Sequence, residues 1–305
     1  MIDFTHANLN VAVIMGGVSA ERQISLLSGD AVIKALLTRN IKAQAIDGVK
    51  QLLATDMQEF DVVFNILHGE AGENGELAGI LSGLNIKYTG CNILGAVLSW
   101  HKNIAKTIVS AHGLKTPKAQ ILKSITELNI TDDGPWIIKP TTEGSSVGLY
   151  YATDIKELTR SIKLSLTTVD SVLVEKFING TECTVAIIQD QVLPVVRIQP
   201  AVGLYDYQAK YQSKTTKYFC PSSFADKLEQ ALKDDAMTAF EALGLKGWAR
   251  IDFIVDDQGN RWFLEANTTP GLTRNSLVPK AAAAIGWSFN DLIIQILSTA
   301  FEPKS

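Results

Sequence analysis

The first ninety residues alternate short apolar runs with helical patterns of apolar and polar positions. The run 10–15 (NVAVIM) predicts a buried strand, and an amphipathic helix follows it to about Arg39. Apolar runs at 43–47 and 61–67 predict further strands, and the second leads through a glycine-rich loop, 68–76, into another helix. Strands that alternate with helices indicate a parallel sheet covered on both faces. Such sheets bind ligands beyond the carboxyl ends of their strands, where the polar loops of this segment lie.

The pattern changes after residue 102, where strand-like runs stand closer together. These runs lie at 116–122, 135–140, 147–153, 171–177, 181–190, 191–200, 247–256 and 260–267, with helices at 154–167 and 224–243 and one helix at the end of the chain. The runs at 181–190 and 191–200 are joined by a tight turn, which indicates antiparallel pairing. The stretch 201–222, rich in Gly, Tyr and Lys, is long for a compact domain, so we expect a lid or a binding loop there.

Composition narrows the class of protein without indicating a function. The 305 residues are 46% hydrophobic, enough to bury two or three cores, and the net charge of −4 does not favour a nucleic-acid-binding surface. No basic segment followed by an apolar run opens the sequence, and no apolar run approaches ~18 residues, so we expect neither a signal peptide nor a membrane span. Cys91, Cys183 and Cys220 are scattered, which favours reduced thiols in a cytoplasmic protein.

The stretch 249–271 contains a group of oxygen-bearing side chains. A symmetric hairpin closed on Gln258-Gly259 places Asp252 opposite Glu265. Asn267 lies two residues beyond Glu265 and projects from the same face. The opposite face receives apolar side chains and is predicted to join a core; these are Ile251, Phe253 and Val255.

Two interpretations of this polar face stay open. Opposed carboxylates ~5 Å apart repel each other, and Mg²⁺ held by one or two carboxylates together with substrate phosphates would relieve the repulsion. Arg250, on the face of Asp252, would then hold a phosphate oxygen. Alternatively, the face is solvated and Arg250 pairs with a carboxylate.

Residues 144–148 (GSSVG) fit the G-x-S-x-G pattern of a serine-hydrolase nucleophile elbow. An elbow requires a helix after the loop and a later histidine, whereas 147–153 predicts a strand. All histidines precede Ser146 in the chain: His6, His68, His101 and His112. The loop lacks the Gly-Lys-Ser/Thr of a Walker A motif, but Lys139 lies just before it. We therefore expect a phosphate-binding flap between two strands, not a nucleophile. The mildly acidic chain likewise disfavours an RNA-binding patch at 201–222.

Seven motifs occur in series: IMGGVSAER, LHGEAGENGELAGIL, YTGCN, KPTTEGSSVG, YDYQAKY, GWARID and LEANTTPGLTRNSLVP. With these motifs, nearly the whole chain resembles the D-alanine–D-alanine ligases of the ATP-grasp superfamily. The resemblance implies a three-domain α/β fold. An N-terminal parallel α/β substrate domain (1–97) would be followed by two α+β domains (98–178 and 179–305), whose antiparallel sheets hold ATP between them. The last domain would carry the lid loop and the metal site.

The resemblance also implies an activity. Family members join two D-alanine molecules through a D-alanyl phosphate intermediate, for peptidoglycan synthesis, and release ADP and phosphate. The cofactors expected from it are ATP and two Mg²⁺ or Mn²⁺ ions. The expected state is a cytoplasmic homodimer, formed through the N-terminal domain, that binds neither nucleic acid nor membrane. Two alternatives are a ligase that takes D-serine or D-lactate as second substrate and a non-catalytic ATP-binding module.

Individual roles carry over to the matching positions. The implied metal ligands are Asp252, Glu265 and Asn267, in agreement with the hairpin. The implied catalytic residues are Glu21, Ser145, Tyr211, Arg250 and Gly271. The residues expected to contact substrate are His68, Lys210, Ser276 and Leu277. The residues expected to contact ATP are Lys102, Lys139, Ser146, Gly148, Glu175, Lys176, Phe177, Ile178 and Glu182. Phe177 departs from many members, which carry Trp at this place in the adenine hinge.

Overall fold

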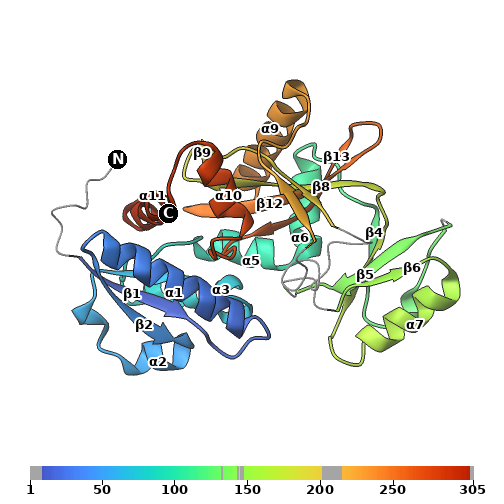
Figure 1. The fold of residues 1–305 in the computed structure, drawn as a ribbon. Coiled ribbons are helices and arrows are strands. Elements are labelled where there is room, and N and C mark those ends of the chain that lie inside the picture. The colour runs from blue at the N-terminus through green and yellow to red at the C-terminus, as the bar shows by residue number, and fades with distance from the viewer. Residues whose placement is uncertain (1–8, 132, 143, 145–147, 201–214, 303–305) are drawn as a thin grey trace.

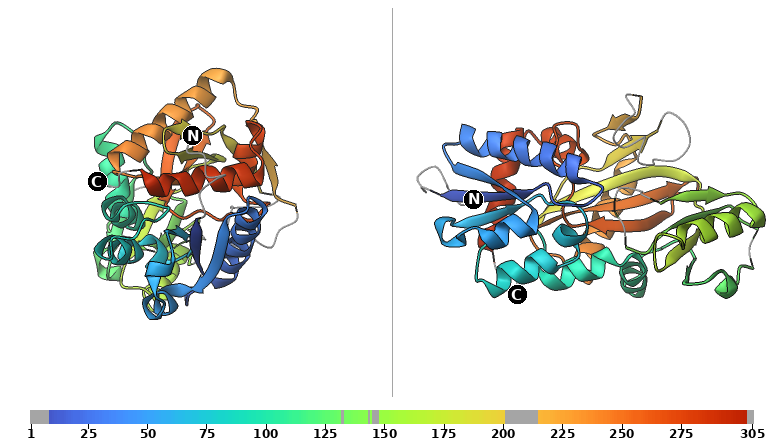
Figure 2. Two further views of the ribbon diagram at one scale, coloured as in Figure 1. Left: turned by 90° about the vertical axis from the view of Figure 1, so that its left-hand side faces the viewer. Right: turned by 90° about the horizontal axis from the view of Figure 1, so that it is seen from below.

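The structure is a computed structural model that describes residues 9–302 except 132, 143, 145–147 and 201–214. Its described part contains a three-stranded sheet, a four-stranded sheet and a six-stranded sheet. The three-stranded sheet is parallel and the other two are antiparallel, as the sequence predicts. The first two sheets lie at opposite ends of the molecule with the six-stranded sheet between them (Figures 1 and 2). The predicted domain limits stay predictions, although each sheet lies within one of the three predicted stretches.

The parallel sheet has the strand order β2-β1-β3. Its strands are β1 (Asn10–Met15), β2 (Lys42–Asp47) and β3 (Val62–Asn65). The helices of this layer are α1 (Arg22–Thr38), α2 (Gly48–Ala54), α3 (Glu70–Glu73) and α4 (Glu76–Gly83). Side chains of β1 alternate between two separate cores, because helices cover both faces of the sheet. The carboxyl ends of β1 and β3 therefore open onto the same edge.

The four-stranded sheet has the order β4-β7-β5-β6. Its strands are β4 (Ala119–Leu122), β5 (Trp136–Pro140), β6 (Tyr150–Ala152) and β7 (Val172–Lys176). Helix α7 (Ile155–Ser165) covers one face, where Leu158 and Ile162 pack against Trp136 and Ile138. Since side chains alternate, the other face carries Lys139 and Glu175.

The six-stranded sheet has the order β11-β10-β8-β12-β13, with β9 paired to β8. Its strands are β8 (Gly180–Ile188), β9 (Gln191–Val192), β10 (Val196–Gln199), β11 (Lys217–Phe219), β12 (Trp248–Asp256) and β13 (Arg261–Asn267). The helices packed around it are α5 (Ile93–Trp100), α6 (Lys102–Ala111), α9 (Asp226–Ala242), α10 (Leu277–Ala284) and α11 (Phe289–Ser298). Short 3-10 helices occupy Met57–Glu59, Ile125–Glu127 and Thr299–Phe301.

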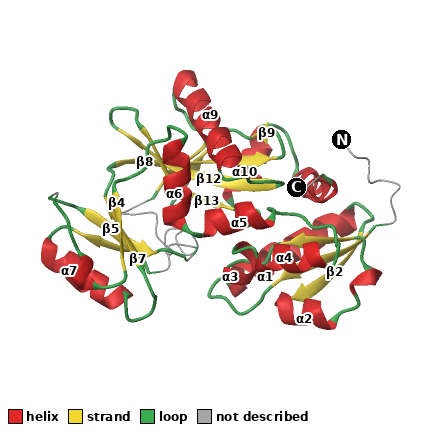
Figure 3. Ribbon diagram, turned by 180° about the vertical axis from the view of Figure 1, so that it is seen from behind, coloured by secondary structure: helices red, strands yellow, loops and turns green. Residues whose placement is uncertain are grey.

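Two cores fix this sheet in place. Apolar side chains of one face pack against α6 and α9. On the other face of the sheet, Ile188 and Trp248 share a core with α1, β1, α10 and α11, so the parallel sheet is joined to the C-terminal helices. Helices α5 and α6 run between the parallel layer and the four-stranded sheet, as the view from behind shows (Figure 3). The three sheets therefore meet around one central region.

The structure corrects several predicted elements. The end of the predicted loop 201–222 forms the strand β11, and the predicted run 191–200 is divided into β9 and β10. The glycine-rich stretch 68–76 is not only a loop, because it contains the short helix α3. The end of the chain forms two helices, α10 and α11, because Gly286 adopts a positive φ of 85° that interrupts the helical path. No single helix among the described residues has the length and apolar character of a membrane span. The bent pair of α10 and Phe289–Phe301 passes that test by length and composition alone.

Candidate active site

The hairpin of β12 and β13 brings two carboxylates together. Asp252 lies opposite Glu265, which confirms the predicted pairing. The predicted two-residue turn is wrong, however, because the N–H of Asp256 donates to the carbonyl of Asn260 and Val255 lies opposite Arg261. A β-bulge between Asp252 and Phe253 then shifts the register by one residue. The longer turn and the bulge compensate each other, and the carboxylates meet as predicted.

The bulge also decides which face Glu265 occupies. Phe263 lies opposite Phe253 and is fully buried, so strict alternation would direct Glu265 into the same core. The extra residue on β13 reverses the alternation and leaves Glu265 on the face of Asp252. Asn267 shares this face, since its Nδ2 donates to Asp252 Oδ2 at 3.0 Å. The predicted core face is confirmed, with Ile251, Phe253 and Val255 all buried.

Asp252 is tightly surrounded by donors. Arg250 binds it with two hydrogen bonds, Nε to Oδ1 at 2.8 Å and Nη2 to Oδ2 at 2.7 Å. The hydroxyl of Thr184 donates to Oδ1 at 2.6 Å, and only 6% of Asp252 is exposed. The expected alternative of a solvated face is therefore wrong at Asp252, although its pairing of Arg250 with a carboxylate is present.

This donor set fits a divalent cation. Two carboxylates and a carboxamide offer the hard oxygen atoms that Mg²⁺ and Mn²⁺ prefer. The described residues contain no group of three or more His, Cys, Asp or Glu side chains arranged for a metal, so the fit rests on Asp252, Glu265 and Asn267 together. Lys102 Nζ lies 3.7 Å from Glu265 Oε2, which leaves that carboxylate only loosely paired to this lysine.

A second cluster of charges faces the hairpin, and its members come from β5 and β7 of the four-stranded sheet and from helix α6. Glu175 of β7 is buried between two lysines, with Oε1 2.8 Å from Lys106 Nζ and Oε2 2.7 Å from Lys139 Nζ. Burial opposes the charge on Glu175, but the two lysines together lower its pKa. Burial also lowers the pKa of Lys106, to about 8, against the attraction of Glu175. Lys139 is buried as well, yet Glu175 and Glu265 raise its pKa.

Sequence reasoning misses Lys106. It lies one helical turn after Lys102 on α6, and this i,i+4 spacing was the available signal, because such residues share one face of a helix. A lysine on an amphipathic helix is normally solvated, and nothing in its local sequence shows that this one is buried opposite Glu175.

At the edge of the parallel sheet, Glu21 and His68 are brought together by their loops. Glu21 directly precedes α1 and is 6% exposed, and the hydroxyl of Ser19 donates to the carbonyl of His68 at 2.9 Å. Gly144 of the predicted flap packs against Glu21 so closely that an added Cβ would lie 2.6 Å from Oε2. The sequence-predicted flap and the loop of Glu21 are therefore in direct contact.

His68 presents an acceptor to the site. Its Nδ1 lies 2.9 Å from the carbonyl of Ile66, so Nδ1 carries the proton and Nε2 carries the lone pair. Among the described residues, the buried Nε2 has no hydrogen-bond partner, and burial lowers the pKa of His68, which keeps the ring neutral at pH 7. A Cβ added at Gly271 would lie 3.6 Å from this nitrogen and 3.3 Å from Ser276 Oγ. Three predicted substrate-side residues thus converge.

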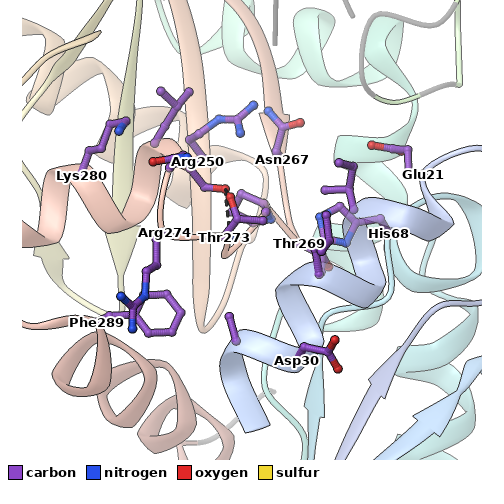
Figure 4. Close-up of a pocket in the computed structure, with 18 of the residues that line it drawn as sticks. Glu21, Asp30, His68, Arg250, Asn267, Thr269, Thr273, Arg274, Lys280 and Phe289 are labelled. Carbon is purple, nitrogen blue, oxygen red and sulfur yellow. Dashed lines mark hydrogen bonds between the residues drawn. The ribbon is translucent and has the colours of Figure 1, made fainter. Parts of the chain in front are cut away.

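A cavity of about 1180 Å³ opens between these groups (Figure 4). Its inner wall contains many of the predicted residues: Glu21, His68, Arg250, Asn267, Gly271, Ser276 and Leu277. Its outer wall is formed by residues that sequence reasoning did not select, among them Asp30, Lys34, Arg274, Lys280 and Phe289. They come from α1, from the segment before α10 and from the two C-terminal helices, and no single motif predicts that these parts of the chain meet. A smaller cavity of about 30 Å³ is lined by Lys102, Gly144, Glu265 and Asn267, among others.

Glu73 is a further carboxyl group that sequence reasoning did not select. It lines both cavities and accepts a hydrogen bond from the N–H of Gly69 at 2.9 Å. Burial, with the nearby charge of Glu21, raises the pKa of Glu73 to about 8. It lies in the glycine-rich stretch 68–76. The sequence predicts that this stretch lies at the ligand-binding edge of the sheet, but it does not distinguish Glu73 from the other residues there.

The residues expected around adenine and ribose lie away from both cavities. Phe177 follows β7, and its ring meets Tyr151 edge-on with the centroids 5.1 Å apart. Lys176 Nζ donates to the carbonyl of Gly134. Glu182 lies two residues from Thr184, which pairs with Asp252, so Glu182 is on the face of the metal candidates. Ile178 follows the hinge, and Gly148, with φ of 70°, packs on Pro140. Ser145, Ser146, Lys210 and Tyr211 lie outside the described residues.

Two antiparallel sheets that face each other, one with the buried Lys139 and the other with carboxylates and an arginine, define an ATP-grasp fold. Profiles described as D-ala D-ala ligase N-terminus and C-terminus match residues 41–91 and 107–298. The chain belongs to the D-alanine–D-alanine ligase family.

Named relatives agree with this assignment. A D-alanine–D-alanine ligase from Mannheimia succiniciproducens is 41% identical over 94% of this chain and 96% of its own. One from Nitrosomonas europaea is 43% identical over 96% of this chain and 97% of its own. The structure of a Bacillus anthracis D-alanine–D-alanine ligase complexed with ATP superposes with a TM-score of 0.84 at 29% identity, covering 96% of this chain and 97% of that one. The VanG D-Ala:D-Ser ligase from Enterococcus faecalis gives 0.82 at 29% identity, covering 96% and 99%.

Proposed function

We propose that this protein joins two D-alanine molecules into D-alanyl-D-alanine, using ATP through a D-alanyl phosphate and releasing ADP and phosphate. The observation that carries the proposal is the cavity in which Glu21, His68, Arg250 and Gly271 converge. The names of the relatives and the ATP-bound neighbour support the choice of substrates. The product is the dipeptide that peptidoglycan synthesis consumes.

In the first step, the carboxylate of one D-alanine attacks the γ-phosphate of ATP. A carboxylate is a poor electrophile, and phosphorylation gives it a good leaving group. The transfer spreads negative charge over the phosphate oxygens, which Lys102, Lys139 and Arg250 would stabilise. Glu21 is the group for the ammonium of this first substrate, because its buried carboxylate lies in the wall of the cavity.

A divalent cation is part of this proposal. Asp252, Glu265 and Asn267 would hold two Mg²⁺ or Mn²⁺ ions, which neutralise phosphate charge when bound. The side chains present already bring the three oxygen donors to one face of the sheet. Arg250 has a second use in this arrangement, since its guanidinium is held in a fixed position by Asp252.

In the second step, the amine of the other D-alanine attacks the acyl phosphate. The tetrahedral oxyanion requires donors, and we assign this role to Arg250 and to the N–H of Gly271; one such donor is worth ~3 kcal/mol. Ser276 and Leu277, at the start of α10, would receive the second carboxylate. His68 Nε2 is an acceptor beside Gly271 and would meet a substrate N–H. Loss of phosphate and a proton completes the amide.

The remaining roles rest on the family resemblance. ATP would lie between the two antiparallel sheets, with the base at Glu175, Lys176, Phe177 and Ile178 and the ribose at Glu182. Ser146 and Gly148 would donate N–H groups to the phosphates. Ser145 would connect Glu21 with Tyr211, and Lys210 and Tyr211 would close the site against water, because acyl phosphates hydrolyse.

The alternative activities are less well supported. A nucleophile elbow is excluded by β6, which follows the flap as a strand paired with β5, where an elbow requires a helix. A D-serine-using ligase is represented by a neighbour of 29% identity, whereas the relatives at 41–43% identity are named D-alanine–D-alanine ligases. The catalytically silent module is disfavoured by the convergence of acid, base and cation side chains in one cavity.

We further propose a cytoplasmic homodimer formed through the N-terminal layer. The residue after α4 and the first turns of α5 expose apolar side chains, Leu84, Ile93, Leu94 and Val97. The described cysteines are free thiols, which suits a reducing compartment. A measured mass of one chain in solution would contradict the dimer.

A phosphate-release assay with ATP, Mg²⁺ and D-alanine tests the activity. We expect release that depends on D-alanine, together with the dipeptide by mass spectrometry. Release without D-alanine dependence would overturn the proposal. Parallel reactions with D-serine or D-lactate added at equal concentration measure the preference for the second substrate.

A further inference from the structure

We propose that Lys106 is a positioning residue for nucleotide binding: by neutralising Glu175, it leaves the charge of Lys139 available to a phosphate. The inference rests on the proposed function only in taking Lys139 as a phosphate contact. It concerns a residue that contacts neither the hairpin carboxylates nor the large cavity among the described residues.

Lys106, Glu175 and Lys139 form a buried triad in which positive charges outnumber negative charges. Glu175 is 3% exposed and Lys106 is 5% exposed, and the side chain of Lys139 is 12% exposed. Each lysine holds a different oxygen of the carboxylate, at 2.8 and 2.7 Å. Two positive charges and one negative charge leave a net charge of +1. Because the site is shielded from water, that charge acts over a longer range than it would at the surface.

The geometry indicates that the uncompensated positive charge is carried by Lys139. Lys106 is held by a second contact, because its Nζ also donates to the carbonyl of Phe263 at 3.2 Å and faces the Phe263 ring at 6.0 Å. Lys139 comes from β5 on the face that looks toward the hairpin, at the strand end before the flap. A phosphate that arrives at this face can therefore share Lys139 while Lys106 keeps Glu175 compensated.

Removal of Lys106 would change this balance. Glu175 and Lys139 would then form an ion pair with no net charge. A phosphate would have to compete with Glu175 for Lys139. Removal of the Glu175 charge as well restores the net charge of +1 on Lys139. The inference thus predicts that nucleotide affinity follows the net charge of the triad, and not the number of intact contacts.

The alternative is a purely structural role. Lys106 connects α6 to β7 through Glu175 and to β13 through Phe263, so it also joins the two sheets. If that is its only role, K106M and K106M/E175Q would both lose stability, and the double variant would bind nucleotide no better than the single variant.

The test is a double-mutant cycle read by ATP affinity. Isothermal titration with ATP and Mg²⁺, without D-alanine, is done on wild type, K106M, E175Q and K106M/E175Q, and repeated in EDTA to separate the lysines from the metal. We expect K106M to weaken ATP binding about tenfold, the equivalent of one charge-assisted hydrogen bond, and K106M/E175Q to return to within about threefold of wild type. K106R keeps the charge and should also approach wild type.

The control is K233M, which removes the lysine of another Lys–Glu pair, with Lys233 Nζ 3.3 Å from Glu229 Oε1 on α9. It should leave ATP affinity unchanged. Unchanged affinity in K106M, or a double variant as weak as K106M, would overturn the inference. Thermal melts show whether a variant is folded, and steady-state kinetics should show the change in KM for ATP with a smaller change in kcat. Because ATP binding is read without catalysis, a wild type that binds ATP but makes no dipeptide contradicts the proposed function alone.

Discussion

Asp252 of β12 lies directly opposite Glu265 of β13, and a β-bulge beside the pair holds both carboxylates on the face that looks toward Lys102 and Lys139. Like charges in this position destabilise a hairpin unless something compensates them. Arg250 and Asn267 compensate Asp252 directly, whereas Glu265 keeps part of its side chain exposed. The pair therefore has the arrangement of a cation site, with two carboxylates on one face of the sheet.

Glu265→Gln should weaken the use of divalent cations. The substitution keeps the size of the side chain and removes one anionic ligand, so we expect the Mg²⁺ concentration for half-maximal activity to rise by about tenfold or more. Phosphate release measured across a Mg²⁺ titration gives this value. Glu241→Gln, on the exposed surface of α9, is the matched control and should not change it. An unchanged Mg²⁺ requirement in the Glu265 variant would remove Glu265 from the metal site.

Part of this site follows from the sequence and part does not. The turn residues correctly predict that Asp252 faces Glu265, but the predicted turn is one residue too short. The bulge shifts the register by one residue in the opposite sense, so the two errors in register cancel. A bulge is a local departure from alternation that the residue types around Leu264 do not announce. Trp262 illustrates the same limit: nothing in its local sequence shows that it is only partly buried and that its Nε1 donates to Asp256.

The fold itself was more predictable than the environment of single side chains. Apolar runs and turn residues are local properties, and they give the order of strands and helices, including the parallel sheet followed by antiparallel sheets. Lys106 of α6 is buried against Glu175 of β7, which is distant in the sequence, and the outer wall of the large cavity depends on α1 lying beside Arg274 and Phe289. Such contacts depend on tertiary packing, which local sequence patterns do not predict.

Arg250→Lys should reduce the rate constant more than it reduces substrate binding. Lysine keeps the charge but loses the planar fork that Asp252 holds with two hydrogen bonds, so the donor for the oxyanion is no longer fixed. We expect kcat to fall by about 10²-fold, with KM for D-alanine changed much less. Steady-state kinetics measure both. Arg261→Lys is the control, because Arg261 lies in the same hairpin and its guanidinium pairs with Asp235 of α9. Equal kinetic effects in the two variants would contradict the assignment.

Gly144→Ala should weaken binding of the first D-alanine. The added Cβ would lie 2.6 Å from Glu21 Oε2, and this contact forces either the flap or the carboxylate to move. We expect KM for D-alanine to rise by about tenfold, since the charge-assisted contact to the ammonium is misaligned.

The control for this variant is Gly79→Ala in α4. An added Cβ at Gly79 meets nothing within 4 Å, so the change tests alanine substitution without a clash. Substrate titrations at saturating ATP measure KM in both variants, and thermal melts confirm that they are folded. A KM for D-alanine that stays at the wild-type value in Gly144→Ala would show that the flap does not constrain Glu21.

Asp256 should make the hairpin sensitive to acid. Its carboxylate accepts hydrogen bonds from Trp262 Nε1 at 2.9 Å and from the Asn260 backbone N–H at 2.8 Å, and these donors lower its pKa to about 2. In the unfolded chain an aspartate has a pKa of about 3.9, so between these values the unfolded state binds more protons and stability falls as pH falls. The contribution is fully present above about pH 4 and is lost toward pH 2.

Asp256→Asn removes this titration. We expect the variant to have a lower urea midpoint than wild type at pH 7, and the difference to shrink as the pH is lowered through 4, because wild type then loses the same charge. Midpoints measured by tryptophan fluorescence at several pH values from 7 down to 3 give the comparison. Asp257→Asn, at the exposed next position, is the control and should follow wild type throughout. A difference between wild type and Asp256→Asn that does not change with pH would show that packing of the turn, and not the carboxylate charge, stabilises the hairpin.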